Sequence, residues 1–169
     1  MRRLLARAVL VLAALALAVA SFSTYRALRQ LQENDRAAES ALAAARALVP
    51  DLLSYDYRTV DRDLARARGR TTGRLTDDYT RLAQTIPPDA RHRQTVRQAV
   101  VAAAGVESAT PEEVRILVFV NTVTSRVEPG SATPRQQVAQ GRVRLVLVTD
   151  GDGWRASDMS TLLGDTPAR

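Results

Sequence analysis

Asp56, Asp61 and Asp63 are carboxylates close enough in the sequence to support metal binding or acid–base chemistry. A hard cation needs several converging oxygen ligands, and glycoside hydrolysis needs two carboxylates at a set separation. Asp61 and Asp63 are two positions apart, so on a helix their side chains would point about 200° from each other. This pair cannot share one small site by itself, and we predict that both residues lie in the first turn of a helix, as capping carboxylates.

A second acidic segment, Asp150-Gly151-Asp152-Gly153, has the spacing of the start of a calcium-binding loop. Such a loop also needs a third acidic residue and a bidentate glutamate at its twelfth position, which is Thr161 in this chain. Both features are missing. Alternating Asp and Gly residues are typical of tight turns, and we therefore predict a β-hairpin turn.

Other catalytic groups are scarce, because the chain has no cysteine, no lysine and one histidine, His92. These absences exclude thiolate catalysis, disulfides, thiolate zinc sites and a Ser-Lys dyad. One histidine cannot supply a zinc site with two imidazoles, and His92 lies in a polar segment typical of a surface. The glycines fall at expected turns, which leaves no phosphate-binding loop. We expect no catalytic residue, no cofactor and no metal.

The basic residues are all arginine: 24 of them stand against 18 acidic residues, for a net charge of +6. Arg2, Arg3 and Arg7 lie at the extreme N-terminus, before all 18 acidic residues, so the rest of the chain carries only 21 − 18 = +3. Because Arg is interspersed with Asp and Glu, the charge pattern argues against a nucleic-acid binder. One group could contact anionic lipid headgroups or an acidic partner, the alternative being a solvated face: Arg66, Arg68, Arg70 and Arg74.

The chain begins with an apolar segment. Residues 8–22 are uncharged, and Leu4 to Tyr25 gives about 22 residues, enough for a helix to cross about 30 Å of hydrocarbon. We predict that residues 1–25 form a basic cytoplasmic tip and a transmembrane anchor, with the body of the protein outside the cytoplasm. Two alternatives are a buried core helix and a signal peptide cleaved after Ala20, where Ala18-Val19-Ala20 fits the small-residue pattern.

Residues 26–49 contain neither glycine nor proline and are rich in helix-forming residues. A largely apolar stripe repeats at intervals of three and four positions: Leu28, Leu31, Asp35, Ala38, Leu42, Ala45 and Val49. We predict a stalk helix that continues out of the membrane. Its stripe would pack on its own domain, space that domain from the membrane, or bind a partner helix.

Short helices are predicted next. Pro50 would end or kink the stalk helix. Thr59 is a suitable N-cap for a helix that ends at Gly69, with acidic residues in its first turn and basic residues in its last. Another helix would begin at Thr71 or Thr72 and stop at Pro87-Pro88.

From about residue 95 the pattern becomes that of β-strands, predicted over residues 96–107, 114–127, 137–149 and 154–159. Gly105 could mark a bulge, and the segment ILVFVN is apolar on both faces, as expected of a central strand covered on each side. Helices followed by an antiparallel meander predict an α+β fold with helices packed on one curved antiparallel sheet. This order is similar to the cone-shaped nuclear-transport-factor-2 (NTF2) fold. We therefore predict a domain over residues 50–163 and a flexible tail over residues 164–169.

A cone-shaped sheet can enclose an apolar pocket, which Tyr79, Phe119 and Trp154 could line. Aromatic residues make up only 4% of the chain, so ordinary core packing is the competing interpretation.

Several segments together resemble the mammalian-cell-entry (Mce)-associated membrane proteins of actinobacteria. They are LLSYDYRTVDRDLARA with RTTGRLTDDY, AAAGV at 102–106, ILVFVNTVT, and GDGWRASDM near the C-terminus. The resemblance runs from the basic N-terminus to about Leu162 and rests on the order and spacing of these motifs. It implies a single-pass accessory subunit with an extracytoplasmic NTF2-like domain, which assists a lipid importer and has no catalytic residues.

We therefore expect a non-enzymatic membrane protein that associates with and stabilises an Mce-type lipid or sterol import complex in the cell envelope. Its partners would be the membrane and transporter subunits, with no nucleic acid. One alternative is an extracytoplasmic module that binds a hydrophobic ligand, such as a lipid, in the cone. Another is an NTF2-like enzyme, which would need an acid or histidine inside the cone.

Overall fold

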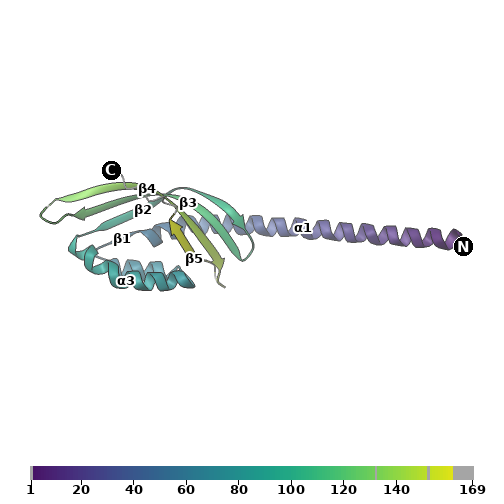
Figure 1. The fold of residues 1–169 in the computed structure, drawn as a ribbon, viewed down its shortest axis with the longest axis horizontal. Coiled ribbons are helices and arrows are strands. Elements are labelled where there is room, and N and C mark those ends of the chain that lie inside the picture. The colour runs from purple at the N-terminus through teal and green to yellow at the C-terminus, as the bar shows by residue number, and fades with distance from the viewer. Residues whose placement is uncertain (1, 132, 152, 162–169) are drawn as a thin grey trace.

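The fold is described from a computed structural model that covers residues 2–131, 133–151 and 153–161, with the backbone alone for residues 2–14 and 16. One long helix, α1 (Arg2–Leu53), enters an α+β body at its C-terminal end and projects far beyond that body at its N-terminal end (Figure 1). Two shorter helices, α2 (Val60–Gly69) and α3 (Arg74–His92), pack against each other below the sheet in this view.

The sheet is an antiparallel meander in the order β1-β2-β3-β4-β5. Its strands are β1 (Tyr55–Asp56), β2 (Val96–Ala109), β3 (Glu113–Val127), β4 (Pro134–Thr149) and β5 (Trp154–Thr161). The predicted α+β fold and its four strands are confirmed, and each strand is longer than predicted. The sequence analysis missed β1, because a strand of two residues is too short to show alternation.

Two details of the predicted strands are wrong. The pairing of β2 with β3 shifts between Val101 and Ala103 and again between Val106 and Ser108, so the irregularities flank Gly105 instead of falling on it. The middle of β3 is covered on one face only, since Val118 is fully buried while Phe119 is 42% exposed. Helices pack on a single face of the sheet, which we call the inner face.

The C-terminal part of α1 belongs to the hydrophobic core. Its buried side chains recur at intervals of three or four positions: Ala37, Ala41, Ala45, Leu48, Val49 and Leu52. The alanines allow the helix axis to lie close to the inner face of the sheet. The predicted stripe therefore has two environments, since Ala45 and Val49 are buried whereas Leu28 and Leu31 are 55% and 60% exposed.

The helix end predicted at Pro87-Pro88 is wrong, and so is the alternative that Pro50 ends the stalk helix. Pro50 lies inside α1, which runs on to Leu53, and the Ser54 N–H donates to the Pro50 carbonyl (3.0 Å). Pro87 and Pro88 lie inside α3, which continues to His92. Packing outweighs the lost backbone hydrogen bonds in α3, because Pro87 is itself buried and the next turn of the helix is held in a second core cluster.

α3 ends in a Schellman motif. The Thr95 N–H donates to the Ala90 carbonyl (2.8 Å) and the Gln94 N–H to the Arg91 carbonyl (3.3 Å). Gln94 takes the left-handed conformation, with φ +48°, that such a motif requires. The turn directs the chain into β2, beside β1.

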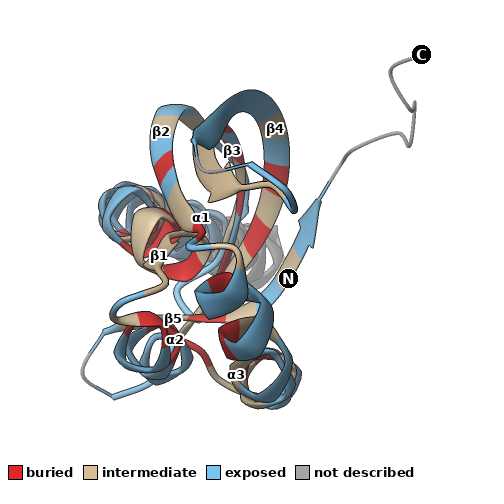
Figure 2. Cartoon of the chain, turned by 90° about the vertical axis from the view of Figure 1, so that its left-hand side faces the viewer, coloured by how far each residue is buried: buried red, intermediate tan, exposed pale blue. Residues whose placement is uncertain are grey.

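The inner face changes character along the β3–β4 hairpin. Near α1 it is apolar and buried, with Val114, Ile116, Val118, Val120, Val143, Leu145 and Leu147 in one core. Toward the tip of the hairpin, residues 134–140 of β4 are all exposed. Figure 2 shows this contrast as pale blue strand ends beyond the red, buried layer. The hairpin therefore has a covered end and an open end, because α1 stops at Leu53.

Candidate functional site

The three aspartates that open the sequence analysis organise the loop before α2. Asp63 is 7% exposed, and its carboxylate accepts hydrogen bonds from the Thr59 hydroxyl (2.7 Å), the Asp56 N–H (3.1 Å) and Arg66 (3.0 Å). Thr59 occupies the predicted N-cap position, but its hydroxyl bonds this carboxylate instead of a backbone N–H. The carboxylate of Asp63 is thus committed to local structure.

The other two aspartates form ion pairs at the surface. The Asp56 carboxylate accepts three hydrogen bonds from Arg58: from its backbone N–H (2.9 Å), its Nε (3.0 Å) and its Nη2 (2.7 Å). These bonds hold the pKa of the Asp56 carboxyl below its usual value. Asp61 pairs with Arg91, which links α2 to α3. Among the residues that the structure describes, no three His, Cys, Asp or Glu side chains converge in a metal-binding group.

The hairpin-turn prediction for the segment after β4 is confirmed. The Asp150 N–H donates to the Gly153 carbonyl (2.9 Å), and Gly151 has a φ of +56°, a conformation that L side chains rarely adopt. Asp152 lies outside the described residues, as do residues 162–169, which include the predicted flexible tail.

The four predicted contact arginines are all exposed but have two kinds of surroundings. Arg66 and Arg70 both pair with Asp51, at 3.3 and 3.6 Å, and so tie α2 to the C-terminal end of α1. Arg68 and Arg74 make no ion pair with any described carboxylate. Only this second pair has its charge fully available to a partner or a lipid headgroup.

The three predicted pocket residues do not gather in one place. Tyr79 is buried under the sheet, and its hydroxyl donates to the Leu52 carbonyl (2.7 Å). Trp154 packs at the edge of the core, and its indole N–H donates to the Ser40 hydroxyl (3.0 Å), which joins β5 to α1. Phe119 lies on the outer face of β3.

The residues that do enclose space lie on the inner face, at the open end of the hairpin. One cavity of about 260 Å³ is lined in its apolar part by Leu53, Val120 and Val143, with Arg97 and Thr122 beside them. A second cavity, of about 320 Å³, adjoins it through Thr124 and Gln137 and is lined further by Arg126, Glu128, Arg135 and Gln136. We call the two together the open groove.

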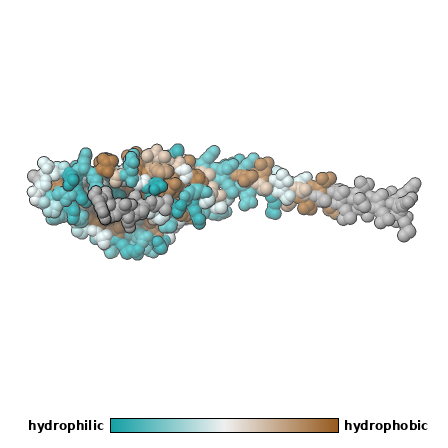
Figure 3. All heavy atoms as spheres, turned by 45° about the horizontal axis from the view of Figure 1, so that its top comes forward, coloured by the Kyte–Doolittle hydropathy of each residue, from teal (hydrophilic) through white to brown (hydrophobic). Residues whose placement is uncertain are grey.

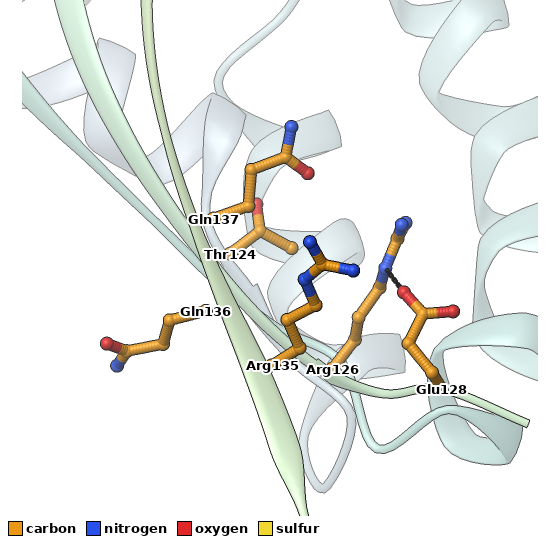
Figure 4. Close-up of a pocket in the computed structure, with 6 residues that line it drawn as sticks. All are labelled: Thr124, Arg126, Glu128, Arg135, Gln136 and Gln137. Carbon is orange, nitrogen blue, oxygen red and sulfur yellow. Dashed lines mark hydrogen bonds and ion pairs between the residues drawn. The ribbon is translucent and has the colours of Figure 1, made fainter. Parts of the chain in front are cut away.

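Side chains from both strands converge in the outer part of the open groove. Figure 4 shows Thr124, Arg126, Arg135 and Gln137 pointing to the same side of the hairpin, while Gln136 points away. Arg126 Nε donates to Glu128 at 2.8 Å. Arg135 has no ion pair with a described residue. The outer groove is therefore polar and basic.

Arg97 occupies the inner part of the groove. It stands opposite Thr124 in the pairing of β2 with β3 and opposite Tyr55 in the pairing with β1. Its Nε is buried without a hydrogen-bond partner among the described residues. Burial raises the pKa of the nearby Tyr79 hydroxyl to about 12, with the positive charge of Arg97 acting in the opposite direction.

Sequence reasoning missed this groove. Arg97 and Thr124 are far apart in the chain and come together only through strand register, which periodicity does not supply. The one available signal was an arginine at the start of an otherwise uncharged strand segment, VRQAVVAAAGV.

The structure is an α+β domain carried on a long N-terminal helix, and its fold is similar to that of domains from type IV secretion proteins. An IcmL-like type IV secretion system protein from Legionella pneumophila has the same fold (TM-score 0.57, 12% identity, 76% of this chain and 94% of that chain). So do the periplasmic domain of DotI (0.55, 13%, 73% and 93%) and VirB8 of Agrobacterium tumefaciens (0.53, 12%, 76% and 94%). At these identities the likeness concerns the fold alone.

The chain belongs to the Rv1363c/MT1408-like family of uncharacterized proteins, whose model matches residues 3–162. Two relatives come from Mycobacterium tuberculosis. "Outer membrane protein Rv1973" is 37% identical over 95 residues, which are 56% of this chain and 58% of that protein. "Uncharacterized protein Rv1362c" is 31% identical over 124 residues, which are 73% of this chain and 54% of that protein. The matched regions span little more than half the length of these relatives.

Proposed function

We propose that this protein is a non-enzymatic accessory subunit of the cell envelope, anchored by a single transmembrane helix, that stabilises a larger membrane assembly. The body of the protein would lie outside the cytoplasm, and the assembly would be an Mce-type lipid or sterol importer. The relatives and structural neighbours support the general part of this proposal, since one relative is named an outer membrane protein and the neighbours include a periplasmic domain and a type IV secretion system protein. The Mce assignment rests on the sequence resemblance.

The observation that carries the proposal is the division of α1 into a buried and a projecting part. Six side chains of its C-terminal part are in the core, whereas its projecting part exposes large apolar side chains: Leu15, Leu17, Val19, Phe22, Tyr25, Leu28 and Leu31. Figure 3 shows brown, apolar spheres interspersed along the projecting helix. Exposed apolar side chains of this number need a membrane or a partner.

No helix within the described residues meets the length and apolarity required to cross a membrane. Most side chains of the proposed anchor, residues 1–14 and 16, lie outside that description.

The next turns of α1 fit a membrane–water interface. Arg26 lies over the Phe22 ring, at 5.1 Å from its centroid, and Arg29 lies over the Tyr25 ring, at 5.0 Å. Aromatic and arginine side chains are favoured at the headgroup level, where the ring is partly buried and the charge is hydrated. On this proposal the domain starts a short distance above the membrane surface.

The non-enzymatic part of the proposal is supported by the arginine partners of the acidic side chains. Asp56, Asp61 and Asp63 are each engaged with arginine, and the pKa of Asp56 is lowered, which is opposite to the shift expected of a general acid. The apolar core of the inner face is built from Val, Ile and Leu.

Photo-crosslinking in the native membrane tests the partner claim. We expect a photoreactive phenylalanine analogue at Leu31 to give crosslinks that contain Mce-type transporter subunits, since this side chain is exposed on the projecting helix. The same analogue at Arg62, which is exposed on α2, serves as the matched surface control. Recovery of the chain alone at Leu31, or identical products at both positions, would contradict the proposal.

A second function is favoured by the open groove: the domain would hold a hydrophobic ligand there. Leu53, Val120 and Val143 supply an apolar wall to a cavity of about 260 Å³. A carrier role and a docking role are compatible, because the groove residues lie toward the tip of the β3–β4 hairpin, and this tip and the projecting helix are on opposite sides of the body (Figure 1).

A further inference from the structure

The open groove contains a cationic group, Arg97, that has no ion-pair partner among the described residues. Arg97 is half-buried, and its Nε is buried and makes no hydrogen bond within the described chain. No described carboxylate lies within the 4.0 Å of its guanidinium that would make an ion pair. Buried polar groups are nearly always hydrogen-bonded, and an unpaired buried donor is unfavourable. The guanidinium borders the groove, so an oxyanion there would pair with its other N–H groups and compensate the charge of Arg97.

Two acidic residues near Arg97 already have partners of their own. Asp56 and Asp63 line an adjacent cavity that Arg97 also borders. Asp56 is held by Arg58, and Asp63 by Thr59 and Arg66. These carboxylates therefore organise the loop before α2 and leave the charge of Arg97 uncompensated on the groove side.

The ligand group that Arg97 would prefer is an oxyanion. A guanidinium presents several N–H donors in a plane that matches a carboxylate or a phosphate. Arg135 and the Glu128-paired Arg126 extend the basic character toward the tip of the hairpin (Figure 4). An uncharged ligand head group would leave the guanidinium N–H donors hydrogen-bonded only to water.

The apolar wall of the groove beside Arg97 favours binding of an alkyl group. Leu53, Val120 and Val143 face the same cavity, with Ala139 and Gly141 between them. A Cβ placed on Gly141 would have no atom within 4 Å, so the cavity is open next to Val120. A chain of methylene groups could fill this space without moving the backbone.

We propose that the open groove binds an anionic amphiphile, whose carboxylate or phosphate head pairs with Arg97 and whose alkyl chain lies against Leu53, Val120 and Val143. This inference rests on the ligand-binding candidate above and is independent of the membrane anchor and of the crosslinked partner.

Calorimetric titration of the full chain tests the inference. The protein is placed in phosphatidylcholine nanodiscs and titrated with octyl phosphate, with octanoate and with uncharged octyl glucoside, and empty nanodiscs are titrated in parallel. Binding of at least one anionic probe above the empty-disc background is expected, with octyl glucoside about tenfold weaker or more. Comparison of octyl phosphate with octanoate shows whether the groove prefers a phosphate ester or a free carboxylate. No binding of either anionic probe, or equal binding of octyl glucoside, overturns the inference.

Two variants assign the binding to this groove. Arg97→Gln should weaken the anionic probe about tenfold or more and leave octyl glucoside unchanged, because a charged hydrogen bond is lost. Its matched control, Arg62→Gln, changes an exposed arginine on α2 and should bind like the native chain. Equal affinity of the Arg97 variant and the native chain contradicts the assignment.

Gly141→Leu should block the alkyl site while keeping every charge. Its control, Gly105→Leu, introduces the same side chain at an exposed position of β2, where a Cβ also meets no atom within 4 Å. Circular dichroism confirms folding of each variant, and Arg97→Gln remains decisive if the Gly141 variant does not fold. Unchanged crosslinks at Leu31 in these variants would show that loss of ligand binding is distinct from loss of the proposed partner.

Discussion

The covered and open ends of the β3–β4 hairpin are built from the same two strands, yet they differ in every physical respect. At the covered end, α1 packs on Ile116 and Leu145, which are fully buried. At the open end the strands continue beyond the end of α1, and the inner face carries Thr122, Thr124 and Gln137. The strand alternation is continuous, so the length of one helix decides which part of the sheet is core and which part is accessible.

The comparison also explains where function can be sought. A core stabilises by excluding water, and any ligand there would have to displace packed side chains. The open end has unfilled space and an unpaired Arg97 Nε. Recognition is therefore expected at the open end of the hairpin and on the projecting part of α1.

A Val→Ala substitution at the covered end and one near the hairpin tip should show the largest difference in the free energy of unfolding. Val118→Ala removes fully buried methyl groups and should lower the free energy of unfolding by about 2 kcal/mol. Val138→Ala removes the same atoms from the outer face of β4 near the hairpin tip, where the side chain is 70% exposed, and should change the free energy of unfolding by less than about 0.5 kcal/mol. Urea denaturation of the two full-length variants measures both values. Equal losses would mean that the outer face of β4 is covered near the hairpin tip in solution.

Tyr79 lies at the boundary between the two ends, and its removal should have an intermediate effect. Tyr79→Phe leaves the Leu52 carbonyl without its 2.7 Å donor and should lower the free energy of unfolding by about 1–2 kcal/mol.

This variant also has a pH signature. The folded-state pKa of Tyr79, about 12, is above its ordinary value of 10.0. The neutral phenol therefore contributes stability that is complete below pH 10 and is lost as the pH rises toward 12. Denaturation at pH 8 and pH 11 should show a smaller alkaline loss for Tyr79→Phe than for the native chain. An identical loss of stability between pH 8 and pH 11 in both proteins would mean that groups other than Tyr79 cause it.

Arg97→Met should have the smallest effect on stability, from zero to a gain of about 1 kcal/mol, although Arg97 is half-buried. The Met side chain ends at the position of the Arg97 Nε, so the substitution keeps an apolar stem and removes an unpaired buried donor. Thermal unfolding without added ligand measures the change, and Arg62→Met is the exposed control. A loss of several kcal/mol would show that Arg97 has a structural partner, which would remove the basis for a ligand at this position.

Local signals in the sequence predicted much of the fold. The charge order around α2 and the Asp-Gly turn before β5 depend on near neighbours, and both elements lie where expected. Proline-based helix ends were wrong because tertiary packing holds α3 together across Pro87. The open groove could not be predicted, since it requires both the register of β2 on β3 and the point at which α1 ends.

The most direct test of the central claim, an uncleaved single-pass anchor with the domain outside the cytoplasm, uses the absence of cysteine from the chain. A cysteine is placed at Glu39, at Ser131, or after Met1, and intact cells are treated with a membrane-impermeant maleimide. The account predicts labelling of Glu39→Cys and Ser131→Cys in intact cells, and labelling of the N-terminal cysteine of the full-length chain only after permeabilisation. Protection of Glu39→Cys in intact cells, or loss of the N-terminal cysteine from the mature protein, would contradict it.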